Sequence, residues 1–287
     1  MGRMISRFFG VSAGVGGLLF ASFSLAAAPI TVKGSDTLVI LAQKWAETYM
    51  SSHPSVKIQV TGGGSGIGFA ALQNNATDIA DASRPIKPGE RAACIKGFGK
   101  SPREYKVALD GLSVYVHSDN PITELSLAQL EQIFTGKAAN WKEFGGKDSR
   151  ITIYSRENSS GTYEFFKEHV LNGKDFSSRA QTMQGTAALL QAVSRDPNAI
   201  GYGGAAFGHG AKVLKIKKTP DSPAIEPNEE NVVSGKYPIW RYLYNYLNPE
   251  KDKGEIAAYL NWIRSPEGQK IVKEVGYYPL PENLLEK

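Results

Sequence analysis

The sequence predicts an α/β fold, in which short β-branched segments alternate with segments whose apolar residues have helical spacing. Several of these strands lead directly into loops rich in Gly, Ser and Thr, which is the arrangement of units with mainly parallel sheets. The chain has 287 residues, of which 41% are hydrophobic and 21% charged, and these values exclude collagen-like, coiled-coil and disordered classes. The length suffices for one large domain or for two lobes of roughly 100–150 residues each.

The N-terminal segment, residues 1–27, is predicted to be a secretory signal peptide. Arg3 and Arg7 form a positive region, an apolar run covers residues 8–25, and Ala26-Ala27-Ala28 offers small residues to a peptidase, so we expect cleavage after Ala26 or Ala27. The alternative is a membrane anchor, but the run is close to the lower length limit for spanning a bilayer and is rich in Gly and Ser. The mature protein is therefore expected in the periplasm, or secreted, without a membrane anchor.

Cysteine, histidine and charge content exclude several functions. Cys94 is the only cysteine, so an intrachain disulfide framework and a cysteine-rich zinc site are excluded, and we expect its thiol to be buried. The four histidines do not have metal-binding spacing, so no metal is predicted. The formal charge of +5 is too weak and too dispersed to predict nucleic-acid binding. Residues 66–71 formally match the dinucleotide fingerprint GxGxxA but lack its acidic partner about 20 positions later, so no cofactor is predicted.

The expected elements can be placed in chain order. In the first part of the chain they are strand 30–32, a helix with apolar positions from Leu38 to Tyr49, strand 56–60, a helix from about 67 to 74, and strand 78–85. Further along they are strand 151–154, a helix carrying Phe165, Phe166 and Val170, a Pro-rich surface loop over 217–235, an aromatic core segment over 237–246, and two helices over 255–264 and 266–275 with Ser265 as cap and Gly276 as stop.

Three of the strand-to-helix loops are the main functional signal. They contain Gly34-Ser35-Asp36-Thr37, the glycine-rich stretch 62–66, and the stretch 155–162. Each would direct backbone N–H groups and a hydroxyl beyond the carboxyl end of its strand, where open α/β sheets bind ligands. The alternative is that these Ser and Thr residues only cap helices. Three such loops together, one with Arg156 four residues before Ser160, favour an oxyanion site.

Six short segments together carry a family pattern. They are Gly34-Ser35-Asp36-Thr37, Gly62-Gly63-Gly64-Ser65-Gly66, residues 78–84, residues 156–162, Ile133-Phe134-Thr135-Gly136 with Asn140-Trp141, and residues 197–202. In this order they resemble the periplasmic phosphate-binding proteins of phosphate ABC transporters. The resemblance covers essentially the whole mature chain and implies a two-lobed type II periplasmic-binding-protein fold. It places lobe 1 at 28–112 plus 219–287 and lobe 2 at 113–218, closing around one oxyanion.

The resemblance also implies ligand-binding residues. The positions that match residues holding phosphate in the family are Ser65, Arg156, Ser160, Gly161 and Thr162, and the first loop could supply the hydroxyl of Ser35 or of Thr37. The physical chemistry agrees, because arginine offers a planar fork of donors and a helix start adds backbone donors.

Arg84 marks a departure from the family pattern. Longer members have an aspartate at this position, which accepts the proton of bound phosphate and so rejects sulfate. Arg84 is therefore either a second cation at the site or a structural residue. Asp36 is then the remaining candidate acceptor, with a helix N-cap as the alternative reading.

The implied partners are inorganic phosphate and the membrane subunits of an ABC permease, and a monomer is expected. Within the binding class the alternative is a receptor for another oxyanion, sulfate or molybdate. A less favoured alternative is a secreted phosphatase that uses the same serines, but the sequence shows neither a metal cluster nor a serine–histidine motif, so an enzyme is not expected.

Overall fold

The computed structural model describes residues 1–2, 28–208 and 210–285. The predicted signal peptide falls almost entirely on residues 3–27, outside the described residues, and stays a prediction. In the ranges that are described, no helix combines the length and the apolar character that a bilayer crossing requires.

The strands form three sheets. The first sheet contains β1 (Ile30–Gly34), β2 (Ile58–Thr61), β3 (Ile79–Ala82), β4 (Arg103–Gly111) and β13 (Trp240–Leu247). The second contains β5 (Ser113–Val116), β7 (Thr152–Arg156), β8 (Gln181–Met183), β9 (Ala199–Gly203) and β10 (Lys212–Val213). The third is small and contains β6 (Glu124–Ser126), β11 (Lys215–Lys217) and β12 (Ala224–Ile225).

The helices flank these sheets. They are α1 (Val39–Ser52), α2 (Ser65–Gln73), α3 (Pro88–Phe98), α4 (Leu127–Phe134), α5 (Gly161–His169), α6 (Gly185–Arg195), α7 (Glu229–Val233), α8 (Gly254–Ile263) and α9 (Pro266–Val275). Short 3₁₀ helices cover Trp141–Phe144, Ala205–Phe207, Pro249–Lys251 and Glu282–Leu284.

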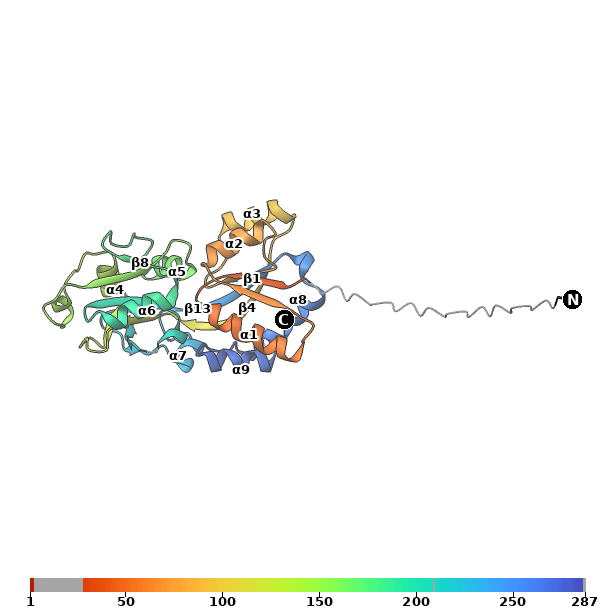
Figure 1. Ribbon diagram of the computed structural model, residues 1–287. Coiled ribbons are helices and arrows are strands. Elements are labelled where there is room, and N and C mark those ends of the chain that lie inside the picture. Colours follow the sequence, from red (N-terminus) through yellow and green to blue (C-terminus); the bar gives the residue numbers. More distant parts are fainter. Residues whose placement is uncertain (3–27, 209, 286–287) are drawn as a thin grey trace.

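The molecule has two lobes that lie side by side (Figure 1). The first sheet, in the order β2-β1-β3-β13-β4, lies with α1, α2, α3 and α8 in one lobe, and the second sheet, in the order β10-β5-β9-β7-β8, lies with α5 and α6 in the other. The strands β6 and β11 share the hydrophobic core of the second sheet, where Leu125 and Ile216 pack with Val114 and Ile200. The predicted two-lobed α/β fold is thereby confirmed, and below we call these parts the first lobe and the second lobe.

Each five-stranded sheet is mixed, whereas mainly parallel sheets were expected. In the first sheet β1 runs parallel to β2 and β3, while β13 runs antiparallel to β3 and β4. In the second sheet β7 runs parallel to β8 and β9, while β5 runs antiparallel to β9 and β10. The antiparallel halves arise where the chain passes between the lobes, because β4 continues into β5 after Leu112 alone and β13 brings the chain back in the opposite direction.

Most of the expected elements are present. The last two helices are confirmed, together with the predicted cap and stop of the second. The Ser265 hydroxyl accepts from the Gly268 N–H, and Gly276 ends α9 at φ 101°, a left-handed value that favours glycine. The aromatic segment forms β13, which lies between β3 and β4 in the first sheet, with Tyr244 and Tyr246 buried. Cys94 is buried, as expected.

The segment 217–235 is not the surface loop that its prolines suggested. It contains β12, which pairs antiparallel with β11, and α7, which begins where the Asn228 side chain accepts from the Asn231 N–H. Val232 and Tyr237 pack in the core of the second lobe. The lobe boundaries stay a prediction, but this pairing favours a return to the first lobe near Ile239 rather than near Lys218.

Candidate functional site

The loops singled out by the sequence meet between the two lobes. The hydroxyl residues Ser35 and Thr37 follow β1, Ser83 follows β3, and Ser65 begins α2, all in the first lobe, while Thr162 lies in the first turn of α5 in the second lobe. All five side chains are buried. Buried polar groups require hydrogen-bond partners, and these hydroxyls find most of theirs in one another.

Four of the hydroxyls form one connected group, which we call the hydroxyl cluster: Thr37, Ser65, Ser83 and Thr162. The Oγ1 atoms of Thr37 and Thr162 lie 2.7 Å apart, and the Ser83 Oγ lies 3.5 Å from the Thr162 Oγ1 and 3.4 Å from the Ser65 Oγ. The Ser83 N–H donates to the Ser65 Oγ over 3.0 Å. Because Thr162 belongs to the second lobe and the other three to the first, the lobes are closed against each other at this point.

Backbone groups also join the lobes beside the cluster. The Gly66 N–H donates to the Ser159 carbonyl over 3.0 Å, and the Ser159 hydroxyl donates to the Gly63 carbonyl over 3.1 Å. At Gly161 an added Cβ would lie only 2.3 Å from the Ser65 Oγ and 2.7 Å from the Ser83 Oγ. The closed arrangement therefore requires glycine at position 161.

Arg156 ends β7 and is brought to the same place, with its side chain almost fully buried. Its Nη2 donates to the Asp36 carboxylate over 2.8 Å, and its Nη1 donates to the Thr186 hydroxyl over 2.8 Å. Its Nε and Nη2 donate to the two oxygens of Glu157 over 3.0 and 2.7 Å. These contacts occupy all but one of its N–H donors, so the free fork expected from the sequence is not available in this arrangement.

Asp36 holds the two lobes together rather than capping a helix. One carboxylate oxygen accepts from the Gly63 N–H over 2.7 Å and the other accepts from Arg156, while α1 begins without a side-chain cap. Burial, together with the nearby charge of Glu157, raises the pKa of Asp36 above its usual value, although Gly63 and Arg156 act in the opposite direction. Arg156 holds the pKa of Glu157 below its usual value against the effect of burial. Asp36 is therefore the carboxylate of the pair that takes up a proton more readily.

Arg84 is not brought to the cluster. Its guanidinium makes a bidentate ion pair with the Glu90 carboxylate, with both distances 2.7 Å, donates to the Pro85 carbonyl, and lies over the Phe69 ring. Ser83 faces the cluster instead, because successive side chains of an extended segment point to opposite sides. This arrangement supports the structural reading of Arg84.

The other predicted residues lie at the edge of the cluster. The Ser160 hydroxyl accepts from the Tyr163 N–H over 3.3 Å and so caps α5, which is consistent with the N-cap alternative for this loop. Ser35 is buried directly after β1, and its N–H donates to the Asp81 carbonyl. The N-terminus of α5 thus faces the first lobe and adds the partial positive charge of a helix start.

Four residues that contact this region were missed by sequence reasoning: Ser83, Thr186, Asp110 and Arg241. Arg241 donates to the Thr162 hydroxyl over 3.0 Å and is paired with Asp110. Ser83 and Thr186 had a usable signal, since each follows a strand at or near a helix start, as the predicted residues do. Arg241 had no such signal, because it lies in an aromatic segment whose composition predicts only a buried core strand or helix.

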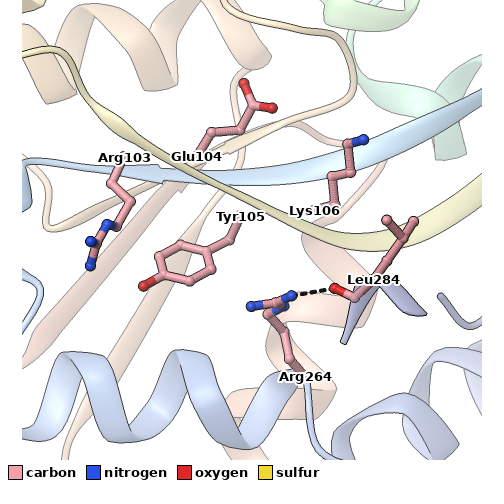
Figure 2. Close-up of a pocket in the computed structure, with 6 residues that line it drawn as sticks. All are labelled: Arg103, Glu104, Tyr105, Lys106, Arg264 and Leu284. Carbon is pink, nitrogen blue, oxygen red and sulfur yellow. Dashed lines mark hydrogen bonds between the residues drawn. The ribbon is translucent and has the colours of Figure 1, made fainter. Parts of the chain in front are cut away.

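A surface cavity of about 460 Å³ lies at the opposite end of β4 from Asp110 (Figure 2). It is lined by Arg103, Glu104, Tyr105, Lys106, Arg264 and Leu284. Its cations already have partners: Arg103 pairs with Asp252, Lys106 lies over the Tyr242 ring, and Arg264 donates to the Leu284 carbonyl. The hydroxyl cluster differs from this cavity because it gathers buried hydroxyls from both lobes, and it is the candidate anion site. Among the described residues no group of His, Cys, Asp and Glu could hold a metal ion.

Comparison with known proteins identifies the family of the chain. A model of the PBP superfamily domain matches residues 21–267. The phosphate-binding protein PstS of Pseudomonas aeruginosa is 34% identical over 270 residues, covering 88% of this chain and 84% of that protein. The phosphate-binding protein PstS of Bacillus subtilis is 32% identical over 260 residues, covering 90% of this chain and 82% of that protein.

Solved structures give the same result. A putative phosphate ABC transporter substrate-binding protein from Clostridium perfringens, with bound phosphate, superposes with a TM-score of 0.80 at 28% identity, covering 88% of this chain and all of that chain. An ABC-type phosphate transport receptor from Vibrio cholerae superposes with a TM-score of 0.69 at 27% identity over the same shares. The chain therefore belongs to the PBP superfamily and, within it, to the family of phosphate-binding proteins that act as substrate-binding components of ABC transporters.

Proposed function

We propose that this chain is exported to the periplasm, binds inorganic phosphate between its two lobes, and delivers it to the membrane subunits of an ABC permease. The observation that carries the proposal is the hydroxyl cluster, which gathers buried donors from both lobes beside Arg156 and the start of α5. The proposed ligand-binding residues are Ser35, Asp36, Thr37, Ser65, Ser83, Arg156, Ser160, Gly161 and Thr162. The proposed unit is a monomer without a membrane anchor.

The number of donors is sufficient for tight binding. A micromolar ligand requires about 8 kcal/mol of net binding free energy. Hydrogen bonds to a charged group contribute about 1.5–3 kcal/mol each, so a handful of them supplies this amount when water is excluded. The burial of the cluster between the closed lobes provides that exclusion.

Phosphate has to compete with carboxylates for Arg156, because its guanidinium donates hydrogen bonds to Asp36 and Glu157. When the anion takes the place of Asp36, it gains an N–H donor and leaves the Asp36 carboxylate beside it. Burial already raises the pKa of Asp36, so this carboxylate is suited to accept the proton of bound hydrogen phosphate. Sulfate has no such proton and would face an unpaired carboxylate, which disfavours its binding.

A receptor fits the site better than a secreted phosphatase. The cluster hydroxyls contact one another, Arg241 and backbone groups, whereas the histidines of the described ranges hydrogen-bond elsewhere: His53 with the Tyr49 carbonyl, His117 with the Asp119 N–H and His169 with the Phe165 carbonyl. A serine nucleophile requires a base within hydrogen-bond reach. We therefore propose a binding function.

Calorimetry of the mature protein tests the proposal. Phosphate is expected to bind with one site per chain, sulfate and molybdate at least 10-fold more weakly, and nitrophenyl phosphate should remain uncleaved under the same conditions. If sulfate or molybdate binds as tightly as phosphate or more tightly, that oxyanion is the ligand instead. If the wild type hydrolyses nitrophenyl phosphate and Ser65→Ala does not, the protein is an enzyme and not a receptor.

Closure of the lobes can be tested separately with Gly161→Ala. The added Cβ would collide with Ser65 and Ser83 across the lobe boundary but would fit the first turn of α5, so we expect intact lobes that cannot close. The phosphate dissociation constant should rise at least 10-fold, and phosphate should no longer compact the protein in small-angle scattering. Gly89→Ala is the matched control, because an added Cβ there meets nothing within 4 Å. A Gly161→Ala variant that binds and compacts as the wild type does would refute this role of the glycine.

A further inference from the structure

A buried ion pair lies behind the hydroxyl cluster, on the two strands that pass between the lobes. Arg241 stands at the start of β13 and Asp110 near the end of β4, and their side chains are almost completely buried. The Nε and Nη2 atoms of Arg241 donate to the same oxygen of Asp110 over 2.9 and 2.7 Å. A charge buried to this degree is retained only when it is paired and hydrogen-bonded.

The remaining contacts of this pair reach both lobes. The Nη1 of Arg241 donates to the Ser83 carbonyl in the first lobe over 3.0 Å, and the Nη2 donates to the Thr162 hydroxyl in the second lobe over 3.0 Å. The second oxygen of Asp110 accepts from the Ala205 N–H over 2.9 Å. The guanidinium of Arg241 also lies over the Phe165 ring of α5, with 5.3 Å from its carbon to the ring centroid. Arg241 is thus fixed from several sides while it contacts the cluster.

The direction of one hydrogen bond follows from the chemistry of the two groups. A guanidinium only donates, so the Thr162 oxygen must accept from Arg241. A threonine hydroxyl carries a single hydrogen, and Arg241 leaves that hydrogen for another partner. The Thr37 oxygen at 2.7 Å and the Ser83 oxygen at 3.5 Å are both within reach of this hydrogen. With an anion between the lobes, the same hydrogen is available to an anion oxygen.

We propose that Arg241 is a positioning residue of the anion site, which acts by holding the Thr162 hydroxyl as a hydrogen-bond donor toward the ligand. Asp110 in turn holds Arg241 and balances its charge, so the effect on the anion passes through the orientation of Thr162 and not through a second net charge. The backbone N–H of Ser83 acts alike on Ser65, because it donates to the Ser65 oxygen and leaves that hydroxyl free to donate. This inference rests on the proposed function, since it assigns the hydroxyls to the same oxyanion.

The test is a double-mutant cycle on phosphate affinity. Arg241→Lys keeps a cation beside Asp110, but an ammonium cannot reach Asp110, the Ser83 carbonyl and the Thr162 hydroxyl together. We expect Arg241→Lys to weaken phosphate binding about 10-fold, or about 1.4 kcal/mol, in calorimetry of the full mature chain. In a Thr162→Val background, which has no hydroxyl to orient, the same lysine substitution should change the dissociation constant less than 2-fold. In a Thr162→Ser background, which keeps the hydroxyl, the loss should return.

Controls separate orientation from stability. Arg91→Lys is the matched control, because Arg91 also donates to a hydroxyl, that of Ser101, but on the surface of the first lobe. Thermal unfolding of every variant identifies those that have lost their fold, and Asp110→Asn offers a second route to loosening Arg241.

Two results would overturn the inference. The first is an Arg241→Lys variant that unfolds at a lower temperature but binds phosphate as tightly as the wild type, which would make the pair structural. The second is an equal loss in the Thr162→Val background, which would mean that Arg241 does not act through Thr162. If the wild type binds none of the oxyanions, the proposed function fails and the inference falls with it, and this outcome is recognised by the wild type alone.

Discussion

Replacing Arg156 with alanine is expected to weaken phosphate binding at least about 100-fold, or about 3 kcal/mol. The substitution removes the cation at the centre of the site, and it also leaves Asp36 and Glu157 without their shared partner. Two unpaired carboxylates would then face the incoming anion, so the loss should exceed that of a single hydrogen bond. Calorimetry with phosphate measures the effect directly.

Three further variants test whether the loss comes from the missing arginine and the unpaired carboxylates. Arg156→Lys should restore only part of the affinity, because a lysine cannot reach Asp36, Thr186 and an anion together. Adding Glu157→Gln to Arg156→Ala should recover some binding by removing one of the repelling charges. Arg150→Ala, at an exposed arginine of the second lobe, is the matched control. A dissociation constant of Arg156→Ala close to that of the wild type would remove Arg156 from the site.

The second large effect concerns Asp81, a buried carboxylic acid on β3 that no ion pair accompanies among the described residues. Burial raises its pKa to about 7, although a hydrogen bond from the Asn245 side chain acts in the opposite direction. The folded state therefore holds this proton more tightly than the unfolded chain does. The stabilisation is complete below the unfolded pKa of 3.8 and is lost as the pH rises through about 7. Each unit of pKa difference corresponds to about 1.4 kcal/mol, so the full effect is about 4 kcal/mol.

We expect Asp81→Asn to remove this pH dependence. The amide is neutral at every pH, so the variant should unfold at higher denaturant concentration than the wild type at pH 8 and should differ little from it at pH 4. Denaturant unfolding at both pH values, compared with Asp221→Asn at an exposed position, gives the free-energy difference. A difference between variant and wild type that is the same at pH 4 and pH 8 would mean that folding does not raise the pKa of Asp81.

The sequence allowed the fold class and most of the site to be predicted, because the signals involved are local. A strand followed by Gly, Ser or Thr and then by a helical pattern places donors at the carboxyl end of a sheet, wherever that sheet lies in the molecule. Ser65, Arg156 and Thr162 carried this signal and meet between the lobes. Whether Ser83 or Arg84 belongs to the site depends on which of these two successive side chains faces the cluster. The sequence alone does not show which side of the segment each residue occupies.

Contacts between distant segments could not be predicted in the same way. Arg241 reaches Thr162 from a strand 79 residues further along the chain, and its own segment reads only as aromatic core. The small strand β12 was hidden because its pairing partner β11 lies across a Pro-rich turn. The carboxylates on Arg156 were also unforeseen, since Asp36 lies 120 residues away from it. The contacts that Arg241 and Arg156 make across the lobes exist only after the two lobes have assembled.

The interior place of β13 in the first sheet sets the order in which the molecule can be completed. This strand lies between β3 and β4, and its Asn245 meets Asp81 across 164 residues of sequence. A chain still emerging from the ribosome has no neighbour for the inner edge of β4 until residues 240–247 have been made, whereas the five strands of the second sheet are all present by residue 213. Bringing together segments so distant in sequence makes folding slow. The second sheet can therefore form during synthesis, and the first lobe stays incomplete until about the last sixth of the chain is being added.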